Sequence, residues 1–200
     1  MPRMPSMLRG ERVALRPVEK TDLPAFTAWY SRYELQRLLT PGAIRLVNQD
    51  AEEAWFRSVH ADGGTWMFAI DALDDPHAPE GRLIGGCSLL NVNGKNRAAT
   101  LGISVADPAM QGRGYGGEAL ELLLEWGFLE LNLNRIQLFV FAFNERARRL
   151  YAKTGFEEEG VLREAIYRDG RYWDEIVMGL LRAEWSPRRT IDHVGQEQRT

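Results

Sequence analysis

Apolar residues recur along the first half of the chain at two spacings, which predict both strands and helices. Residues 11–16 alternate apolar and charged positions, as a half-buried strand does. Thr21 and Asp22 are suited to cap a helix that runs through residues 26–30, and residues 50–60 repeat the helical spacing. Three further strands are predicted near residues 65–71, 82–91 and 98–105.

The second half shows the strongest periodicity. At 118–131, apolar residues follow the i, i+3, i+4, i+7 spacing with glutamates on the other side, which predicts a helix. Residues 135–143 are apolar almost throughout and predict a central strand covered on both faces. A short helix at 144–154 is expected to end at Gly155. Asp169-Gly170 predicts a hairpin between two final strands, near residues 161–168 and 172–181.

The order of elements is therefore strand, two helices, three strands, helix, strand, helix and two strands. Helices connect some of the strands and hairpins join others, which indicates one mixed α+β domain. We place this domain at residues 1–185, followed by a polar tail without periodicity at 186–200. A chain of 200 residues is long enough to bury a substantial core.

Composition and charge limit the binding partners and the cellular location that we expect. The chain is 44% hydrophobic and 26% charged, and its net charge of −3 gives no reason to expect nucleic-acid binding. No apolar run is long enough to span a bilayer, and the first residues lack a signal-peptide core, so we expect a cytoplasmic protein without a bound metal. The single cysteine, Cys87, excludes an intrachain disulfide, and its apolar neighbours favour a core residue over a catalytic thiol.

The most informative motif is the glycine-rich loop at residues 110–117, between a predicted strand and the clearest helix. Glycines let backbone N–H groups approach a ligand closely, and the helix N-terminus adds a partial positive charge. Arg113 supplies a full positive charge. Together these features predict a site for phosphate oxygens, with a flexible surface turn as the plain alternative.

The same loop satisfies the G-x-G-x-x-G fingerprint of dinucleotide-binding proteins through Gly112, Gly114 and Gly117. In that fold the glycines follow the strand directly, whereas residues 106–111 intervene here. The next strand ends at Asn144, where an acidic residue would be expected to bind the ribose. The Gly-Lys-Ser/Thr sequence of a P-loop is absent. The context therefore argues against a nicotinamide dinucleotide.

Several segments, taken in order, resemble the GNAT acetyltransferases. The sequence QGRGYG at 111–116 resembles their Gln/Arg-x-x-Gly-x-Gly/Ala signature, and residues 101–105 resemble the strand before it, their fourth. Residues 144–156 resemble their later Asn…Ala…Leu-Tyr…Gly-Phe block. The resemblance spans about residues 8–181. Three segments look like the RimJ/RimL-type branch of the family: residues 8–13, 161–165 and 169–174.

This resemblance implies a GNAT acyl-CoA acyltransferase fold, with a mixed, mostly antiparallel sheet of six to seven strands and about four helices. It also implies acetyl-CoA as co-substrate, with its pantetheine arm between the splayed fourth and fifth strands. Asn144 matches an asparagine that contacts the cofactor, but it also suits a helix N-cap, and both roles stay open. The implied cofactor-binding residues are Ile103, Val105, Gln111, Gly112, Arg113, Gly114, Tyr115, Gly116 and Asn144.

Tyr151 matches the general acid of the family. Transfer of an acetyl group from acetyl-CoA expels a thiolate, and a phenol of pKa about 10 can protonate a thiolate whose thiol has a pKa of about 8.5. The other reading of Tyr151 is a core aromatic, because it shares one helix face with Ala147, Leu150 and Thr154.

The general base and the acceptor follow less directly. Many RimJ/RimL-type relatives carry Glu on the fourth strand where this chain has Thr100, and a threonine cannot act as a base near neutral pH. An α-amine of pKa about 8 is partly neutral without a base, whereas a lysine amine of about 10.4 is not. We therefore expect an N-terminal α-amine of a protein or peptide as acceptor. A small amine such as a polyamine or aminoacyl compound, or a non-catalytic acyl-CoA-binding module, are the alternatives, and a monomer and a homodimer are both open.

Overall fold

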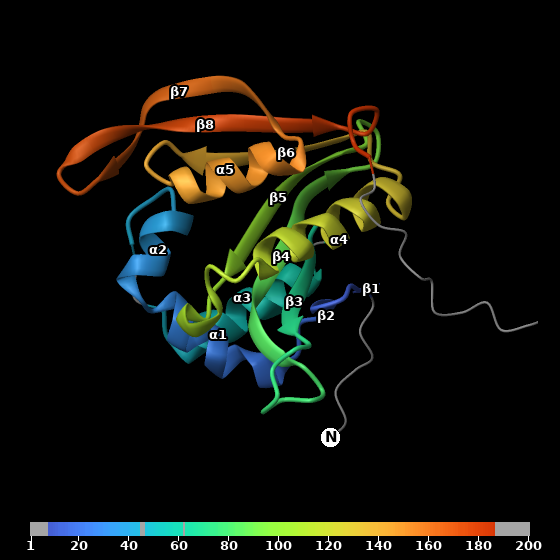
Figure 1. Cartoon of the computed structure of the whole chain (residues 1–200). Coiled ribbons are helices and arrows are strands. Elements are labelled where there is room, and N and C mark those ends of the chain that lie inside the picture. The colour runs from blue at the N-terminus through green and yellow to red at the C-terminus, as the bar shows by residue number, and fades with distance from the viewer. Residues whose placement is uncertain (1–7, 45–46, 62, 187–200) are drawn as a thin grey trace, which may run out of the picture.

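The computed structural model describes residues 8–44, 47–61 and 63–186, and within them one sheet of eight strands forms the centre of the fold (Figure 1). The strand order is β1-β2-β3-β4-β5-β6-β8-β7. Neighbouring strands are antiparallel except β5 and β6, which are parallel. The strands are β1 (Leu8–Arg9), β2 (Val13–Pro17), β3 (Trp66–Ala72), β4 (Arg82–Asn93), β5 (Ala98–Val105), β6 (Arg135–Phe141), β7 (Glu157–Arg168) and β8 (Arg171–Leu181).

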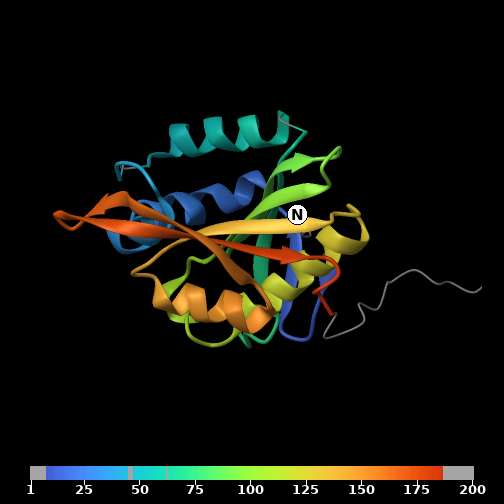
Figure 2. The same ribbon diagram turned by 90° about the horizontal axis from the view of Figure 1, so that it is seen from above.

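Helices cover both faces of this sheet. Figure 2 shows α1 and α3 on one face and α4 and α5 on the other. None of the described helices combines the length and the hydrophobicity that a membrane span requires. The helices are α1 (Leu23–Tyr30), α2 (Tyr33–Leu39), α3 (Gln49–Ala61), α4 (Tyr115–Leu129) and α5 (Glu145–Thr154), with short 3-10 turns at Lys20–Asp22 and Pro108–Met110.

The predicted α+β class is confirmed, and the structure adds two short elements to it. The eighth strand is β1, which has only two residues, and the fifth helix is α2, which lies in a region expected to be a loop. Leu35 is the buried residue of α2, so its seven residues carry too little amphipathic pattern to be recognised. Strand β7 begins four residues before its predicted start, because Glu157 and Glu158 pair with β8 despite the low strand propensity of glutamate.

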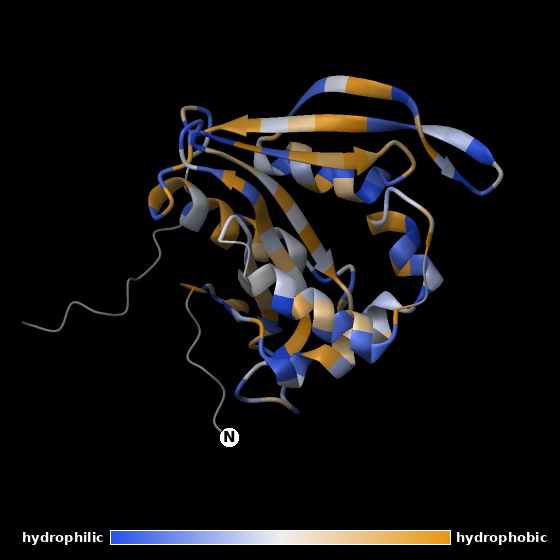
Figure 3. Ribbon diagram, turned by 180° about the vertical axis from the view of Figure 1, so that it is seen from behind, coloured by the Kyte–Doolittle hydropathy of each residue, from blue (hydrophilic) through white to orange (hydrophobic). Residues whose placement is uncertain are grey.

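The main hydrophobic core lies between the sheet and α4. Figure 3 shows apolar residues running along the central strands. Leu120, Leu123 and Leu124 of α4 are fully buried in this core, as the helical spacing predicts. Cys87 on β4 also belongs to it, and burial raises the pKa of its thiol, so the prediction of a core cysteine is confirmed. This packing fixes β4, β5 and the start of α4 relative to one another.

A buried ion cluster joins β2 and β3 to the turn that precedes α1. The guanidinium of Arg16 is 2% exposed and donates to both carboxylate oxygens of Asp22, at 2.7 and 2.8 Å, and to Asp71 at 2.8 Å. Asp22 precedes α1 as predicted, but its carboxylate does not cap that helix; it accepts hydrogen bonds from Arg16 and from the backbone N–H of Glu19. The cluster fixes α1 against β2 and β3.

Candidate active site

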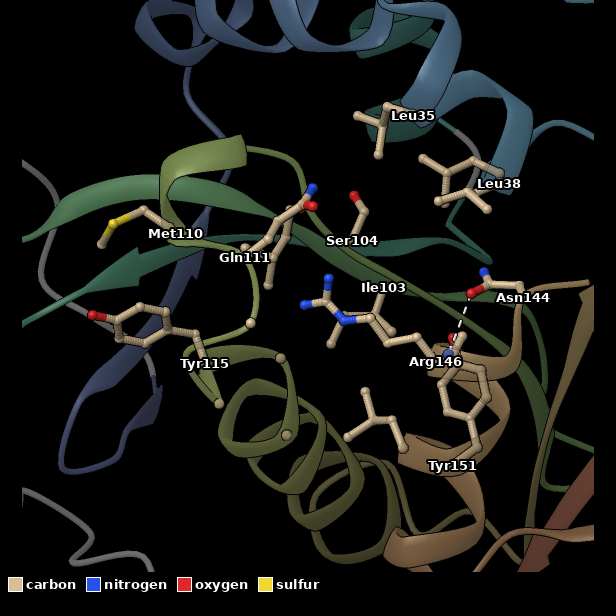
Figure 4. A pocket seen from close by; sticks show the side chains of 18 residues that line it. Leu35, Leu38, Ile103, Ser104, Met110, Gln111, Tyr115, Asn144, Arg146 and Tyr151 are labelled. Carbon is tan, nitrogen blue, oxygen red and sulfur yellow. Dashed lines mark hydrogen bonds between the residues drawn. The ribbon is translucent and has the colours of Figure 1, made fainter.

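The central feature of the site is a gap between β5 and β6. The two strands pair only where Ala98–Thr100 face Arg135–Gln137, and β5 then continues to Val105 without pairing to β6. A cavity of about 280 Å³ opens beside this gap, between β5, the glycine loop and the start of α5 (Figure 4). Backbone groups of β5 along this edge are therefore free of a β6 partner, and an extended ligand can lie against them.

The glycine loop forms one wall of this cavity. Gly112 and Gly114 have φ values of +81° and +92°, in the left-handed region that favours glycine. Gly114 directly precedes α4, a helix of 15 residues. Among the described residues, no acceptor is found for the backbone N–H groups of 112–116. These N–H groups and the helix dipole are suited to bind an anion, which is the role that the sequence predicts for the loop.

A second layer of contacts holds the loop in place. The side chain of Tyr115 is 3% exposed, and its hydroxyl donates to Asp74 Oδ1 at 2.7 Å, directed away from the cavity (Figure 4). Arg12 lies over the Tyr115 ring, with its guanidinium 4.5 Å from the ring centre, and it donates to Asp74 at 2.8 Å and to the Arg113 carbonyl at 3.0 Å. The hydrogen bond from Arg12 lowers the pKa of Asp74, so this pair stays ionised. Any contact of Tyr115 with a ligand therefore comes from its backbone.

Gln111 joins the loop to β5. Its side-chain amide donates to the carbonyl of Val105 at 2.9 Å, so the acceptor group of Val105 is already engaged. Ile103 and Val105 both line the cavity, as do Gln111, Gly112, Gly114, Tyr115 and Gly116. Of the predicted cofactor-binding set, Arg113 lies in the loop but is not among the lining residues. The structure thus brings nearly all of the predicted residues to one cavity.

The start of α5 forms the opposite wall. The side-chain oxygen of Asn144 accepts from the backbone N–H of Ala147 at 3.3 Å, drawn as a dashed line in Figure 4, so its role as helix N-cap is confirmed. Asn144 also lines the cavity, and its amide nitrogen donates to none of the described residues. Arg146 lines the same wall and was missed from the sequence, because an arginine in a basic helix resembles an ordinary solvated charge.

Tyr151 lies about two helical turns after Asn144 along α5. It is 8% exposed, and its ring packs edge-on against Phe156 at 5.9 Å between ring centres. Tyr151 also lines the cavity, so the same side chain packs in the core and contacts the cavity. Burial raises the pKa of the Tyr151 phenol to about 12, and the phenol is therefore protonated at neutral pH.

At the far end, the cavity is bounded by α2 and by Ser104. Leu35, Leu38 and Leu39 of α2 line it, and Figure 4 shows Ser104 on the same side as Leu35 and Leu38. The Ser104 hydroxyl lies 3.0 Å from the hydroxyl of Tyr30 on α1. Thr100 lies farther along β5, where the two strands still pair, and it is not among the lining residues.

The last hairpin is bound to α2 and to the residues that follow it. Asp169 at the hairpin turn accepts from the hydroxyl of Tyr33 at 3.1 Å and from Arg37 Nε at 2.9 Å. Arg168 donates to the carbonyls of Thr40 and Gly42, at 2.7 and 3.1 Å. The region 32–44 and the β7–β8 hairpin therefore close this end of the molecule together.

A sheet splayed between two parallel strands, with an anion-binding glycine loop on one side and a buried phenol on the other, defines a transferase that binds an acyl-CoA. The sequence agrees: the model of the acetyltransferase (GNAT) domain matches residues 12–157. The chain belongs to the GNAT family and is an acetyl-CoA-dependent N-acetyltransferase.

Individual relatives are similar at moderate identity. The spermidine N(1)-acetyltransferase of Vibrio cholerae is 32% identical over 136 residues, which cover 68% of this chain and 74% of the relative. The crystal structure of spermidine N-acetyltransferase from Vibrio cholerae in complex with CoA and spermine superimposes with a TM-score of 0.78 at 27% identity, covering 86% of this chain and 97% of the other. The uncharacterized N-acetyltransferase YoaA of Bacillus subtilis is 27% identical over 177 residues, 88% of this chain and 97% of YoaA.

Proposed function

We propose that this acetyltransferase modifies the α-amine at the N-terminus of a protein or peptide, as its RimJ/RimL-type segments imply. The observation that carries the proposal is the aliphatic end of the cavity, formed by Leu35, Leu38 and Leu39. Among the residues that the structure describes, no Asp or Glu lines the cavity. A peptide terminus brings one charge and an adjacent side chain, which suits such a surface, whereas a buried polycation without carboxylates is unfavourable.

Acetyl-CoA would bind along the walls already described. The pyrophosphate suits the free N–H groups of 112–116, with Arg113 as the adjacent cation. The pantetheine arm suits the edge of β5 at Ile103 and Val105, which β6 does not pair. The Val105 carbonyl already accepts from Gln111, so a ligand would contact Val105 through its N–H. The free amide nitrogen of Asn144 is a further donor on the opposite wall.

The chemistry is a direct transfer. The amine nitrogen attacks the thioester carbon, the C–N bond forms, and the C–S bond breaks. The departing thiolate takes the proton of the Tyr151 hydroxyl, which the raised pKa of about 12 keeps in place until then. Because this pKa lies above the thiol value of about 8.5, the proton transfer by itself is unfavourable, and it is driven by the C–S cleavage and amide formation to which it is coupled. As the amide forms, the nitrogen gives up a proton, and this proton restores the Tyr151 hydroxyl.

A polyamine is the second candidate acceptor. It is favoured by the similarity of this chain to the spermidine N(1)-acetyltransferase of Vibrio cholerae in sequence and to the solved spermidine N-acetyltransferase in structure. The two candidates differ in what they require of the protein. A polyamine carries several ammonium groups, so it needs carboxylates near the acceptor end, while an α-amine needs room for one side chain. Spermidine therefore belongs in the same assay as a peptide.

The test is a thiol-release assay with acetyl-CoA and three acceptors: a short peptide that begins with alanine, the same peptide with a blocked N-terminus, and spermidine. We expect turnover with the free peptide, none with the blocked peptide, and weaker turnover with spermidine. Efficient turnover with spermidine alone would replace the proposed acceptor by a polyamine. Binding of acetyl-CoA without thiol release to any acceptor would instead indicate a non-catalytic acyl-CoA-binding module.

A further inference from the structure

The general base is the role that the sequence leaves open, and one buried carboxylate on the acceptor side of the sheet is suited to it. Glu52 on α3 is 6% exposed. Within the described ranges, no cation and no hydrogen-bond donor contacts its carboxylate. Four aspartates that are similarly buried are each paired with arginine: Asp22 and Asp71 with Arg16, and Asp75 and Asp107 with Arg82.

Glu52 faces Tyr30. Phe56, one turn further along α3, packs in the same small hydrophobic cluster as Tyr30, so this face of α3 is directed toward α1. The Tyr30 ring stacks on Phe26, with 5.7 Å between ring centres. Burial, and to a lesser degree the negative charge of Glu52, raise the pKa of the Tyr30 phenol to about 12. The carboxylate therefore acts electrostatically on the phenol that reaches the cavity wall.

Tyr30 connects this carboxylate to the cavity. Its hydroxyl lies 3.0 Å from Ser104 Oγ, and Ser104 lines the cavity from β5. Ser104, Tyr30 and Glu52, in this order, thus lead from the cavity into the interior between α1 and α3. A buried carboxylate that binds no cation lowers stability, because ionised groups are poorly solvated there. A carboxylate placed at the end of such a series suits proton transfer better than structural support.

We propose that Glu52 is the terminal proton acceptor of the acetyl transfer and that Ser104 and Tyr30 relay the proton to it from the bound ammonium group. The proton on the nitrogen moves to Ser104 Oγ, and the Ser104 proton moves to the Tyr30 oxygen. The Tyr30 proton then reaches the carboxylate through a bridging water molecule, because the two side chains share no direct hydrogen bond. The amine is then neutral and Glu52 is protonated. Glu52 returns its proton to solvent after the product leaves. The proposal rests on the transfer to an amine described above.

The local charges suit this relay. Burial raises the pKa of Glu52, which makes its carboxylate a stronger base and reduces the free-energy cost of taking a proton from an α-ammonium of pKa about 8. Among the described residues, the titratable groups that act on Tyr30 are Glu52 on α3 and Cys87 on β4. The Tyr30 phenol and the Cys87 thiol are both neutral at pH 7, because their pKa values are raised. Tyr30 therefore passes the proton on without holding a charge. Where relatives carry a glutamate on the strand at Thr100, α3 supplies the carboxylate here.

The test compares the pH dependence of kcat/KM for the wild-type enzyme and Glu52→Gln with the alanine peptide. At pH 6.5 we expect Glu52→Gln to be slower by about 30-fold, because only the neutral fraction of the amine, about 3% for a pKa of about 8, can react. The deficit should shrink toward pH 9, above the α-amine pKa of about 8. Tyr30→Phe should reproduce this profile. Glu53→Gln, on the same turn of α3 but paired with Gln49 and Arg57 at the surface, should behave as wild type.

A merely structural role would lower the rate equally at every pH, so parallel profiles for the wild-type enzyme and Glu52→Gln would overturn the proposal. If Glu52→Gln does not fold, Tyr30→Phe carries the test, since it removes one oxygen and keeps the ring. The same profiles are measured with spermidine, whose amines resemble lysine with a pKa of about 10.4, and there the deficit should persist to pH 9. Turnover of spermidine alone with that deficit would remove the α-amine acceptor but keep the relay. A protein that acetylates neither amine would overturn both.

Discussion

The hydroxyl of Tyr30 on α1 lies 3.0 Å from the hydroxyl of Ser104 on β5. This contact links the helical layer on one face of the sheet to the strand that lines the cavity on its unpaired edge. It places the acceptor side and the acetyl-CoA side of the enzyme on the same short strand. Changes to β5 should therefore affect both binding and transfer.

Tyr151→Phe tests the general acid. The substitution keeps the ring that packs on Phe156 and removes only the hydroxyl, so we expect kcat to fall by about 10²- to 10⁴-fold while acetyl-CoA affinity is nearly unchanged. Steady-state kinetics and calorimetric titration measure the two effects separately. Since the pKa of Tyr151 is raised to about 12, its ionisation should cause no loss of rate below about pH 11. A variant with the wild-type kcat would remove Tyr151 from the mechanism.

Gly85→Ala tests the close approach of β4 to β5. A Cβ atom at Gly85 would lie 2.0 Å from the carbonyl oxygen of Ser104, so β5 must shift. We expect a loss of about 1–3 kcal/mol or more in the free energy of unfolding and a weaker affinity for acetyl-CoA. Gly94→Ala is the matched control, because nothing lies within 4 Å of its Cβ position. Equal affinities for both variants would show that the position of β5 does not govern binding.

Arg12→Ala tests the support of the glycine loop. Arg12 contacts the loop through Asp74, the Tyr115 ring and the Arg113 carbonyl, yet it does not line the cavity. Its loss should raise the dissociation constant of acetyl-CoA several-fold and leave kcat at saturating substrate close to wild type, because the reacting groups are untouched. A fall in kcat at saturation without a change in affinity would contradict this reading.

The sequence predicted the loop and α5 well, because both are encoded locally. The glycines at 112 and 114, the cap at Asn144 and the stop at Gly155 each fix the backbone within a few residues. The support by Arg12 was not predictable, since its partners Asp74 and Tyr115 are distant in sequence and only the sheet brings them together. In the sequence, Glu52 resembles its polar neighbours Gln49, Asp50 and Glu53 on α3. Only the folded structure shows that Glu52 is buried and that these neighbours are not.

Glu52→Gln should also stabilise the fold at neutral pH. The folded-state pKa of Glu52 is raised above its unfolded value by burial, so its stabilising contribution is present at low pH and is lost as pH rises through the folded pKa. Wild-type protein should therefore lose stability from about pH 4.5 upward relative to Glu52→Gln. Urea unfolding at pH 5 and pH 7.5 measures the difference. A variant less stable than wild type at pH 7.5 would show that Glu52 has a stabilising role in the fold.

The most direct test of the central claim is the mass of the alanine peptide after incubation with the enzyme and acetyl-CoA. We predict one added acetyl group on the N-terminal nitrogen, none on the blocked peptide, and a matching release of one thiol per acetyl group. A peptide of unchanged mass, at an enzyme concentration that binds acetyl-CoA, would contradict the assignment of a peptide α-amine as the acceptor.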